Sequence, residues 1–134
     1  MKKINVFEKN NTDLEVFNDD RGTIADVFYN HAINHVAIIT SEPNVIRGNH
    51  YHKETTQHML MTKGSLEYWY KDFGSDEPAK MYVAKVGDLV STKPFEIHGL
   101  RICSEGNEFI VFSEGLRGGK DYESDTYRVE SIIG

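Results

Sequence analysis

Apolar and polar positions alternate in short runs along most of this 134-residue chain. In residues 65–71, for example, Leu66, Tyr68 and Tyr70 alternate with Ser65, Glu67 and Trp69. In a β-strand successive side chains point to opposite faces, so a period of two residues indicates a strand. Clusters rich in Asn, Asp, Gly and Pro separate the runs, and the sequence lacks an amphipathic helical stretch of convincing length. The pattern therefore predicts short strands and turns throughout.

The predicted strands define an all-β fold in a single domain covering residues 1–134. We expect the first strand to start near Ile4 and further strands at 14–17, 23–29, 33–40, 45–51, 57–62, 65–71, 80–84, 89–90, 99–103, 107–113 and 126–132. Three neighbouring pairs are expected to double back as hairpins: 45–51 with the strand from 57, 57–62 with 65–71, and 99–103 with 107–113. Many short strands with frequent turns are typical of a sandwich or barrel, and we predict a double-sheet jelly roll.

Composition and charge narrow the choice of partners and compartment. The net charge of −6 argues against binding to nucleic acid, but not against a small anionic ligand held by a few arginines. Cys103 is the single cysteine, so a disulfide within the chain is impossible, as is usual in a reducing compartment. The sequence shows neither a signal peptide nor an apolar run long enough to cross a membrane. We expect a soluble, cytoplasmic protein without a membrane partner.

Histidines with regular spacing are the main candidates for chemistry. His50 and His52 lie one residue apart, so a strand points both imidazoles the same way. Gln57 and Gly64 follow after four and six residues, and a second segment has Gly87, six residues, Pro94, three residues and His98. Three imidazoles with the Gln57 carbonyl suit a divalent ion such as Zn, Fe, Mn or Ni, with no organic cofactor. A polar pocket without a metal remains the alternative.

This two-part spacing resembles the signature of the cupin superfamily. Its first part is His-x-His, three or four residues, Glu, six residues and Gly, and its second part ends in Pro and His. The resemblance covers the central half of the chain and implies a double-stranded β-helix, the jelly-roll cupin fold. Gln57 stands where most metal-binding cupins have glutamate.

A narrower resemblance concerns residues 47–57, which contain Arg-Gly-x-His-x-His-Lys and a downstream Gln. This motif is similar to that of dTDP-4-keto-6-deoxyglucose 3,4-ketoisomerases, and Arg-Gly-x-His is also found in dTDP-4-dehydrorhamnose 3,5-epimerases. Residues 122–127 are similar to the cupin domain of capsular polysaccharide reductases, which holds a metal. The resemblance implies an isomerase or epimerase of a nucleotide-linked keto-deoxysugar in surface polysaccharide biosynthesis. His98 favours the metal-bound branch of these proteins, and Gln57 is compatible with either branch.

The implied reaction moves a proton next to a ketone, which needs a base and a group that stabilises the enolate. His50 or His52 is the expected base, and Tyr68 or Tyr70 the expected acid, while strand alternation points Tyr51 away. A bound metal is the alternative means of polarising the ketone. Substrate binding is assigned to Arg47 and Lys53 as partners of a diphosphate, and to Arg21 as part of an upstream Arg-Gly element. Alternation turns Arg47 away from His50 unless a bulge at Gly48 intervenes.

Several other features complete the set of expectations. His58 is expected on the outer face or in a dimer interface, His35 in the interior, and the acidic run 121–125 in a solvated turn. The strand at 59–61 has apolar residues on both faces, which predicts a homodimer. Two other functions stay open: a metal-dependent cupin of another class, such as a small-molecule dioxygenase, and a non-catalytic ligand-binding cupin.

Overall fold

A computed structural model describes residues 1–115 and 124–134. The described residues form strands and loops, with a 3₁₀ turn at 124–125. The strands are β1 (Lys2–Asn5), β2 (Val16–Asp19), β3 (Gly22–Ala25), β4 (His35–Ser41), β5 (Ile46–Tyr51), β6 (Thr56–Lys63), β7 (Leu66–Asp72), β8 (Lys80–Ala84), β9 (Asp88–Thr92), β10 (Glu96–Ile102), β11 (Asn107–Glu114) and β12 (Tyr127–Arg128). None of these residues lies in a helix that is long and apolar enough to cross a membrane.

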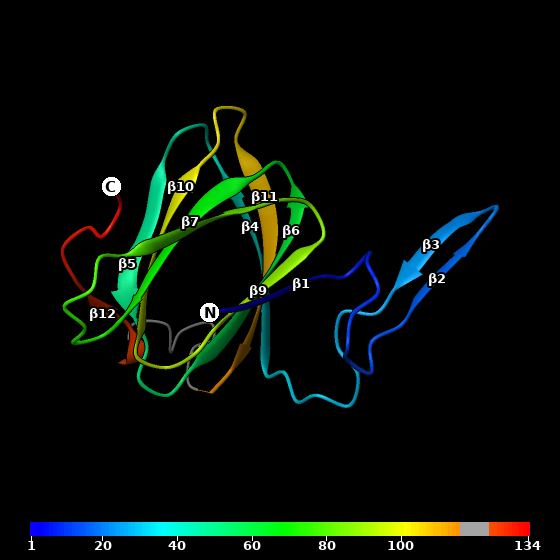
Figure 1. Cartoon of the computed structure of the whole chain (residues 1–134), viewed down its shortest axis with the longest axis horizontal. Helices are drawn as coiled ribbons and strands as arrows, with labels where there is room; N and C mark the ends of the chain where they lie inside the picture. The colour runs from blue at the N-terminus through cyan, green and yellow to red at the C-terminus, as the bar shows by residue number, and fades with distance from the viewer. Residues whose placement is uncertain (116–123) are drawn as a thin grey trace.

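Two antiparallel sheets of five strands face each other and form the body of the molecule (Figure 1). The first sheet has the order β1-β9-β6-β11-β4, and the second has the order β12-β5-β10-β7-β8. Side chains that alternate inward from both sheets meet in one apolar core. The core residues are Met59, Met61, Leu66, Tyr68, Ala84, Val90, Leu100, Ile102, Phe109 and Val111. The predicted all-β jelly roll is confirmed.

The three predicted hairpins are wrong, because the two strands of each pair lie in opposite sheets. β5 belongs to the second sheet and β6 to the first, so the chain does not double back at residues 52–55. β6 pairs with β9 and β11, whereas β7 pairs with β8 and β10. β10 and β11 likewise lie in opposite sheets. Apolar alternation identifies a strand's inner face, but it does not say which neighbour the strand pairs with.

Two of the predicted strands are markedly shorter in the structure. The predicted strand at 126–132 is reduced to β12, which pairs with His50 and Tyr51 of β5. Beyond it, the N–H of Val129 bonds to the Asn49 carbonyl and the N–H of Ile132 to the Asn49 side chain. These bonds hold the C-terminal segment against β5 without a regular ladder. The predicted strand at 23–29 ends at Ala25, where β3 has reached the end of its pairing with β2.

The hairpin β2–β3 projects away from the two sheets (Figure 1). Among the described residues its two strands pair with each other alone, and its Phe17 and Ile24 side chains are exposed. Arg21 lies at its turn and forms an ion pair with Asp19. The hairpin therefore places Arg21 outside the body of the domain.

Candidate active site

An irregularity between β5 and β10 shapes the candidate site. In this ladder His98 pairs with His50 and Gly99 pairs with Gly48, so Asn49 is an additional residue on β5. Gly48 and Asn49 both have a positive φ, of 80° and 57°. One extra residue with a left-handed backbone is a β-bulge, which reverses the alternation of the strand.

The bulge brings Arg47 and His50 to the same side of the sheet. Both side chains line the cavity between the sheets, although regular alternation would separate them. A side chain at Gly48 would place its Cβ 2.8 Å from the His98 carbonyl oxygen, so the close approach of β10 requires glycine. The bulge that the sequence required for an inward Arg47 is therefore present.

Three of the histidines singled out by their spacing meet between β5 and β10. The ring centroids of His50 and His98 are 4.7 Å apart, those of His50 and His52 5.0 Å, and those of His52 and His98 5.4 Å. Each ring offers one nitrogen to a set in which all nitrogens lie within 4.8 Å of one another. The residues are 9%, 1% and 5% exposed for His50, His52 and His98. Residues 48 positions apart thus form one buried cluster.

Backbone carbonyls fix which ring nitrogens of this cluster can react. The Nδ1 of His52 lies 2.7 Å from the carbonyl oxygen of Asp125, and the Nδ1 of His98 lies 3.1 Å from that of Glu96. Because a carbonyl only accepts, both Nδ1 atoms donate a proton, and Nε2 is left as the basic nitrogen. The Nε2 of His52 lies 3.1 Å from the side-chain oxygen position of Gln57. An amide can turn its NH₂ towards a neutral imidazole, which a carboxylate cannot do.

Asp125 holds the loop that follows the second histidine. Its carboxylate accepts hydrogen bonds from the N–H groups of Lys53, Glu54 and Thr55 and from the Thr55 hydroxyl. Burial opposes its ionisation, but these bonds, that from the Thr55 side chain first, lower the pKa of Asp125 below its ordinary value. At 2% exposure, Asp125 contradicts the expected solvated turn, while residues 121–123 lie outside the described part of the chain. The sequence did not reveal that Asp125 binds this loop, because an aspartate in an acidic run looks the same whether its side chain is buried or exposed.

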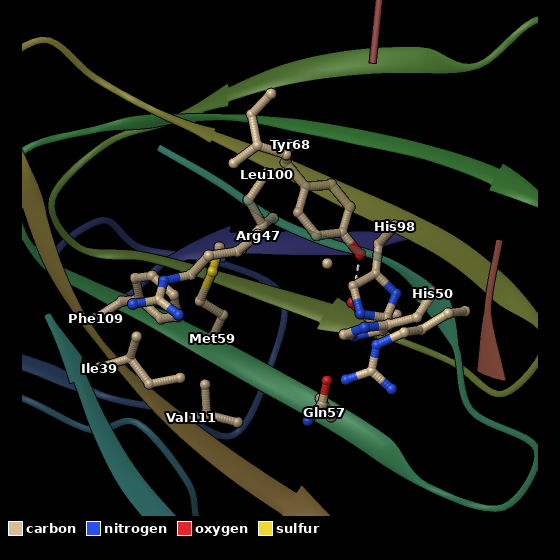
Figure 2. Close-up of a pocket in the computed structure, with 14 residues that line it drawn as sticks. Ile39, Arg47, His50, Gln57, Met59, Tyr68, His98, Leu100, Phe109 and Val111 are labelled. Carbon is tan, nitrogen blue, oxygen red and sulfur yellow. Dashed lines mark hydrogen bonds between the residues drawn. The ribbon is translucent and has the colours of Figure 1, made fainter. Parts of the chain in front are cut away.

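A cavity of about 260 Å³ opens beside the histidines. Figure 2 shows His50, His98 and Gln57 together at one end, with apolar side chains around the other end. The apolar walls come from Ile39, Ile46, Met59, Leu100, Phe109 and Val111. His52 lies behind this surface and does not border the cavity. The cavity therefore combines titratable groups with an apolar surface large enough for a ring.

Two arginines border the same cavity. Arg47 donates to the Ser41 hydroxyl at 2.8 Å and to the Thr40 carbonyl at 3.1 Å, which directs its guanidinium across the edge of the first sheet. Arg128 pairs across the ladder with His50 and also lines the cavity. Arg128 was not among the sequence candidates. Its position follows from the pairing of β12 with β5, which has no motif in the sequence.

The two predicted tyrosines lie in different surroundings. Tyr68 borders the cavity, and its hydroxyl contacts Thr92 and lies 3.4 Å from a Glu96 carboxylate oxygen. Burial, with the Glu96 charge, raises the pKa of Tyr68 well above its ordinary value, so the phenol stays protonated. Tyr70 instead lines a separate surface hollow with Lys93 and Glu96. Of the two, Tyr68 borders the cavity and Tyr70 does not.

The remaining predicted binding residues lie outside the cavity lining. Lys53 places its ammonium 4.2 Å from the centre of the Tyr127 ring, in a cation–π contact. Arg21 has a side chain that is 83% exposed, at the turn of the projecting hairpin. Within one chain, the structure therefore brings Arg47, but neither Lys53 nor Arg21, to the cavity that His50 and His98 border.

The cluster of His50, His52 and His98 has the donor chemistry of a divalent-metal site. Metal-binding histidines normally donate their second ring N–H to a carbonyl or carboxylate, as His52 and His98 do here. Three neutral imidazoles with an open position suit zinc or iron. Gln57 adds a neutral oxygen, which is a weaker ligand than a carboxylate.

One protein family matches most of the chain. The family described as the polysaccharide biosynthesis C-terminal domain matches residues 17–115. A comparison with curated proteins finds no match.

Solved structures share the fold at low sequence identity. A 3,4-ketoisomerase from Helicobacter canadensis is 21% identical with a TM-score of 0.74, over 96% of this chain and 90% of that one. A dTDP-4-dehydrorhamnose 3,5-epimerase from Bacillus anthracis, with TDP and PPi bound, is 19% identical with a TM-score of 0.67, over 90% and 82%. The capsular polysaccharide assembling protein CapF from Staphylococcus aureus is 20% identical with a TM-score of 0.64, over 90% of this chain but 33% of CapF.

Proposed function

This chain belongs to the polysaccharide biosynthesis C-terminal domain family, and we propose that it is an isomerase or epimerase of a nucleotide-linked keto-deoxysugar. The observation that supports the proposal is one cavity that joins His50, His98 and Gln57 to two arginines. Ketoisomerases and epimerases of such sugars share its fold. A dioxygenase would need the histidines but not two arginines in the lining of the cavity.

We assign the diphosphate of the substrate to Arg47 and Arg128. Guanidinium groups bind phosphate oxygens through paired N–H donors, and both residues border the cavity. The apolar surface around Phe109 and Leu100 would accept the deoxygenated part of the sugar or a base. The sugar ketone would then lie at the histidine end.

We assign the base to His50, because it borders the cavity whereas His52 lies behind it. A proton next to the ketone moves to the ring of His50, because imidazole is the most common general base in enzymes. His52 and Gln57 orient the surroundings of the cluster through their mutual contact. Tyr68, kept protonated by burial, donates a hydrogen bond or a proton to the developing enolate.

A divalent metal is compatible with the same residues. His50, His52 and His98 would hold it, with Gln57 as a neutral neighbour. When bound, such an ion would polarise the ketone oxygen and stabilise the enolate. His50 would then be a ligand, and a group other than His50 would have to accept the proton.

The proposal includes a homodimer in the cytoplasm. Val36 and Ile38 on the outer face of the first sheet are 56% and 69% exposed. Leu60 and Phe112 lie on the same face and are half-buried. A contiguous apolar face of this kind is typical of a protein interface.

Solvent-deuterium exchange into a dTDP-4-keto-6-deoxysugar tests the proposal. We expect the chain to catalyse incorporation of deuterium next to the ketone, and His50→Asn to slow it by at least about 100-fold. His35→Asn is the matched control, because His35 does not line the cavity. Both variants should retain the circular dichroism spectrum of the native chain.

Binding measured in parallel separates the alternatives. Stabilisation of the chain by TDP without any exchange would favour the non-catalytic ligand-binding domain. Neither binding nor exchange with TDP-, UDP- or CDP-linked ketosugars would contradict the proposed function. Exchange that is unchanged in His50→Asn would exclude His50 as the base.

A further inference from the structure

A second group of metal-binding side chains lies outside the cavity. His31 comes from the segment 26–34 that returns from the projecting hairpin to β4 (Figure 1). His58 and Glu114 come from β6 and β11. Each offers one ligand atom to a set in which all atoms lie within 4.8 Å of one another. We call these three residues the outer cluster.

The ligand atoms of the outer cluster converge on one point. Both Nε2 atoms face the same Glu114 oxygen, Oε2, at 2.8 Å from His31 and 2.6 Å from His58. The Nδ1 of His58 is held by the Ser91 hydroxyl at 2.7 Å. A hydroxyl oxygen can accept the Nδ1 proton, which leaves Nε2 as the coordinating nitrogen.

We propose that His31, His58 and Glu114 form a second divalent-metal site, for Zn²⁺ or an ion of similar ligand preference. Two imidazoles and one carboxylate are an established ligand set for zinc with one open position. The site does not depend on the proposed enzymatic function, because none of its residues borders the cavity.

A tetrahedral ion with nitrogen and oxygen ligands would fit the outer cluster after a small opening of its present contacts. Bonds of roughly 2.0–2.2 Å to zinc place neighbouring ligand atoms about 3.3–3.5 Å apart. The His31 and His58 contacts to Glu114 would have to open by less than 1 Å, which rotation of the Glu114 side chain can supply. Ca²⁺ and Mg²⁺ require more oxygen ligands than the outer cluster offers.

The surroundings give the outer cluster one apolar wall and one open side. The Phe28 ring packs against His31 at 5.3 Å and against His58 at 5.1 Å between ring centroids. The side chains of His31 and Glu114 are 40% and 34% exposed, so water can complete the coordination. Burial opposes ionisation of Glu114, but hydrogen bonds from His58 and His31 lower its pKa, so it stays a carboxylate ligand.

A metal at this position would connect three elements. It would fasten the segment 26–34 to β6 and β11, both of which belong to the first sheet. His58 is also the neighbour of Gln57, whose side chain points into the cavity on the opposite face. The ion would therefore order the base of the projecting hairpin and one wall of the cavity.

Calorimetric titration of Zn²⁺ into the metal-stripped full chain tests the site. We expect His31→Ala to bind one equivalent fewer than the native chain, and Glu114→Gln to weaken that equivalent by at least tenfold. His98→Ala should remove only binding at the cavity histidines. His35→Ala, which changes a histidine outside both clusters, should leave the stoichiometry unchanged.

Hydrogen exchange gives a second measurement that does not depend on counting sites. Zn²⁺ is expected to slow amide exchange in residues 26–34 of the native chain and of His98→Ala, but not of His31→Ala. Native stoichiometry in His31→Ala would overturn the proposal, as would identical exchange in 26–34 with and without Zn²⁺. Because His31 is exposed, circular dichroism should show that His31→Ala remains folded.

Discussion

Strand β6 separates two histidine clusters that differ in how their nitrogens are held. On the inner side, Gln57 faces His50, His52 and His98, which are buried. Backbone carbonyls hold the rings of His52 and His98. On the outer side, His58 shares the Glu114 carboxylate with His31 near solvent. Adjacent residues on one strand thus belong to different chemical environments.

The difference is one of charge. The inner cluster has a neutral amide where the outer cluster has a carboxylate. A buried imidazole with neutral partners can gain or lose a proton without disrupting an ion pair, which suits proton transfer. A carboxylate between two imidazoles offsets the charge of a cation, which suits a permanent metal. The inner cluster is therefore the better candidate for catalysis and the outer cluster for a structural ion.

The largest expected effect comes from Asp125, on which the inner cluster depends. Asp125→Ala leaves three N–H groups of the loop 53–55 without their acceptor, and we expect a loss of roughly 3 kcal/mol in the free energy of unfolding. Urea denaturation at pH 7 measures it. Glu114→Ala is the control, with an expected loss below about 1 kcal/mol because Glu114 is partly exposed. Equal losses would contradict the role given to Asp125.

Gln57→Glu is expected to make the inner cluster resemble the outer one. A carboxylate beside His50, His52 and His98 should tighten Zn²⁺ binding there by about 10–100-fold, because it adds a charged ligand. The measurement is a Zn²⁺ titration in the His31→Ala background, which isolates the inner cluster. The same variant should lose deuterium exchange if a neutral His52 is needed. Unchanged zinc affinity would show that Gln57 does not face the ion.

The residues of the inner cluster could be predicted from the sequence, because they lie either close together or at the spacing of a known family signature. His50 and His52 share a face by alternation, and Pro94 and His98 complete the resemblance. The jelly roll, which the strand pattern and the resemblance predicted, is confirmed by the two facing sheets. The strand pairing was not predictable in the same way, since apolar alternation in β6 and β7 does not record which sheet each joins.

The missed residues all depend on contacts between distant segments. Asp125 reaches the loop 53–55 from some 70 positions away, and Arg128 reaches the cavity through the two-residue strand β12. His31 lies in a loop, and its partner Glu114 lies 83 positions later. Isolated polar residues give no periodic signal from which such distant partners can be inferred.

Three arginine variants test which of the candidate residues bind the diphosphate. Arg47→Ala and Arg128→Ala are each expected to weaken TDP binding by about tenfold, the loss of a charge-assisted contact. Arg21→Ala should have no effect, because Arg21 lies on the projecting hairpin. Calorimetry with TDP compares the three. Weakened binding in Arg21→Ala would instead indicate that the hairpin reaches the cavity of another copy.

Acid unfolding compares the two carboxylates and gives the smallest expected effect. Asp125 and Glu114 both have a folded-state pKa below their ordinary values of 3.8 and 4.5. A lowered carboxyl pKa stabilises the folded chain above the unfolded value, and this stabilisation is lost as pH falls through the folded one. The free energy of unfolding should therefore fall as pH decreases below about 5.

Single variants show which carboxylate causes this dependence of the free energy of unfolding on pH. In the metal-free chain, Asp125→Asn should reduce the dependence most, because Asp125 is buried among donors. Glu114→Gln should reduce the pH-dependent part of the free energy of unfolding by less than about 1 kcal/mol, because solvent screens the contacts of Glu114 with His31 and His58. Urea midpoints between pH 3 and pH 6 measure both. A larger change in Glu114→Gln than in Asp125→Asn would contradict this expectation, since the carboxylate of the outer cluster would then contribute more to stability than Asp125.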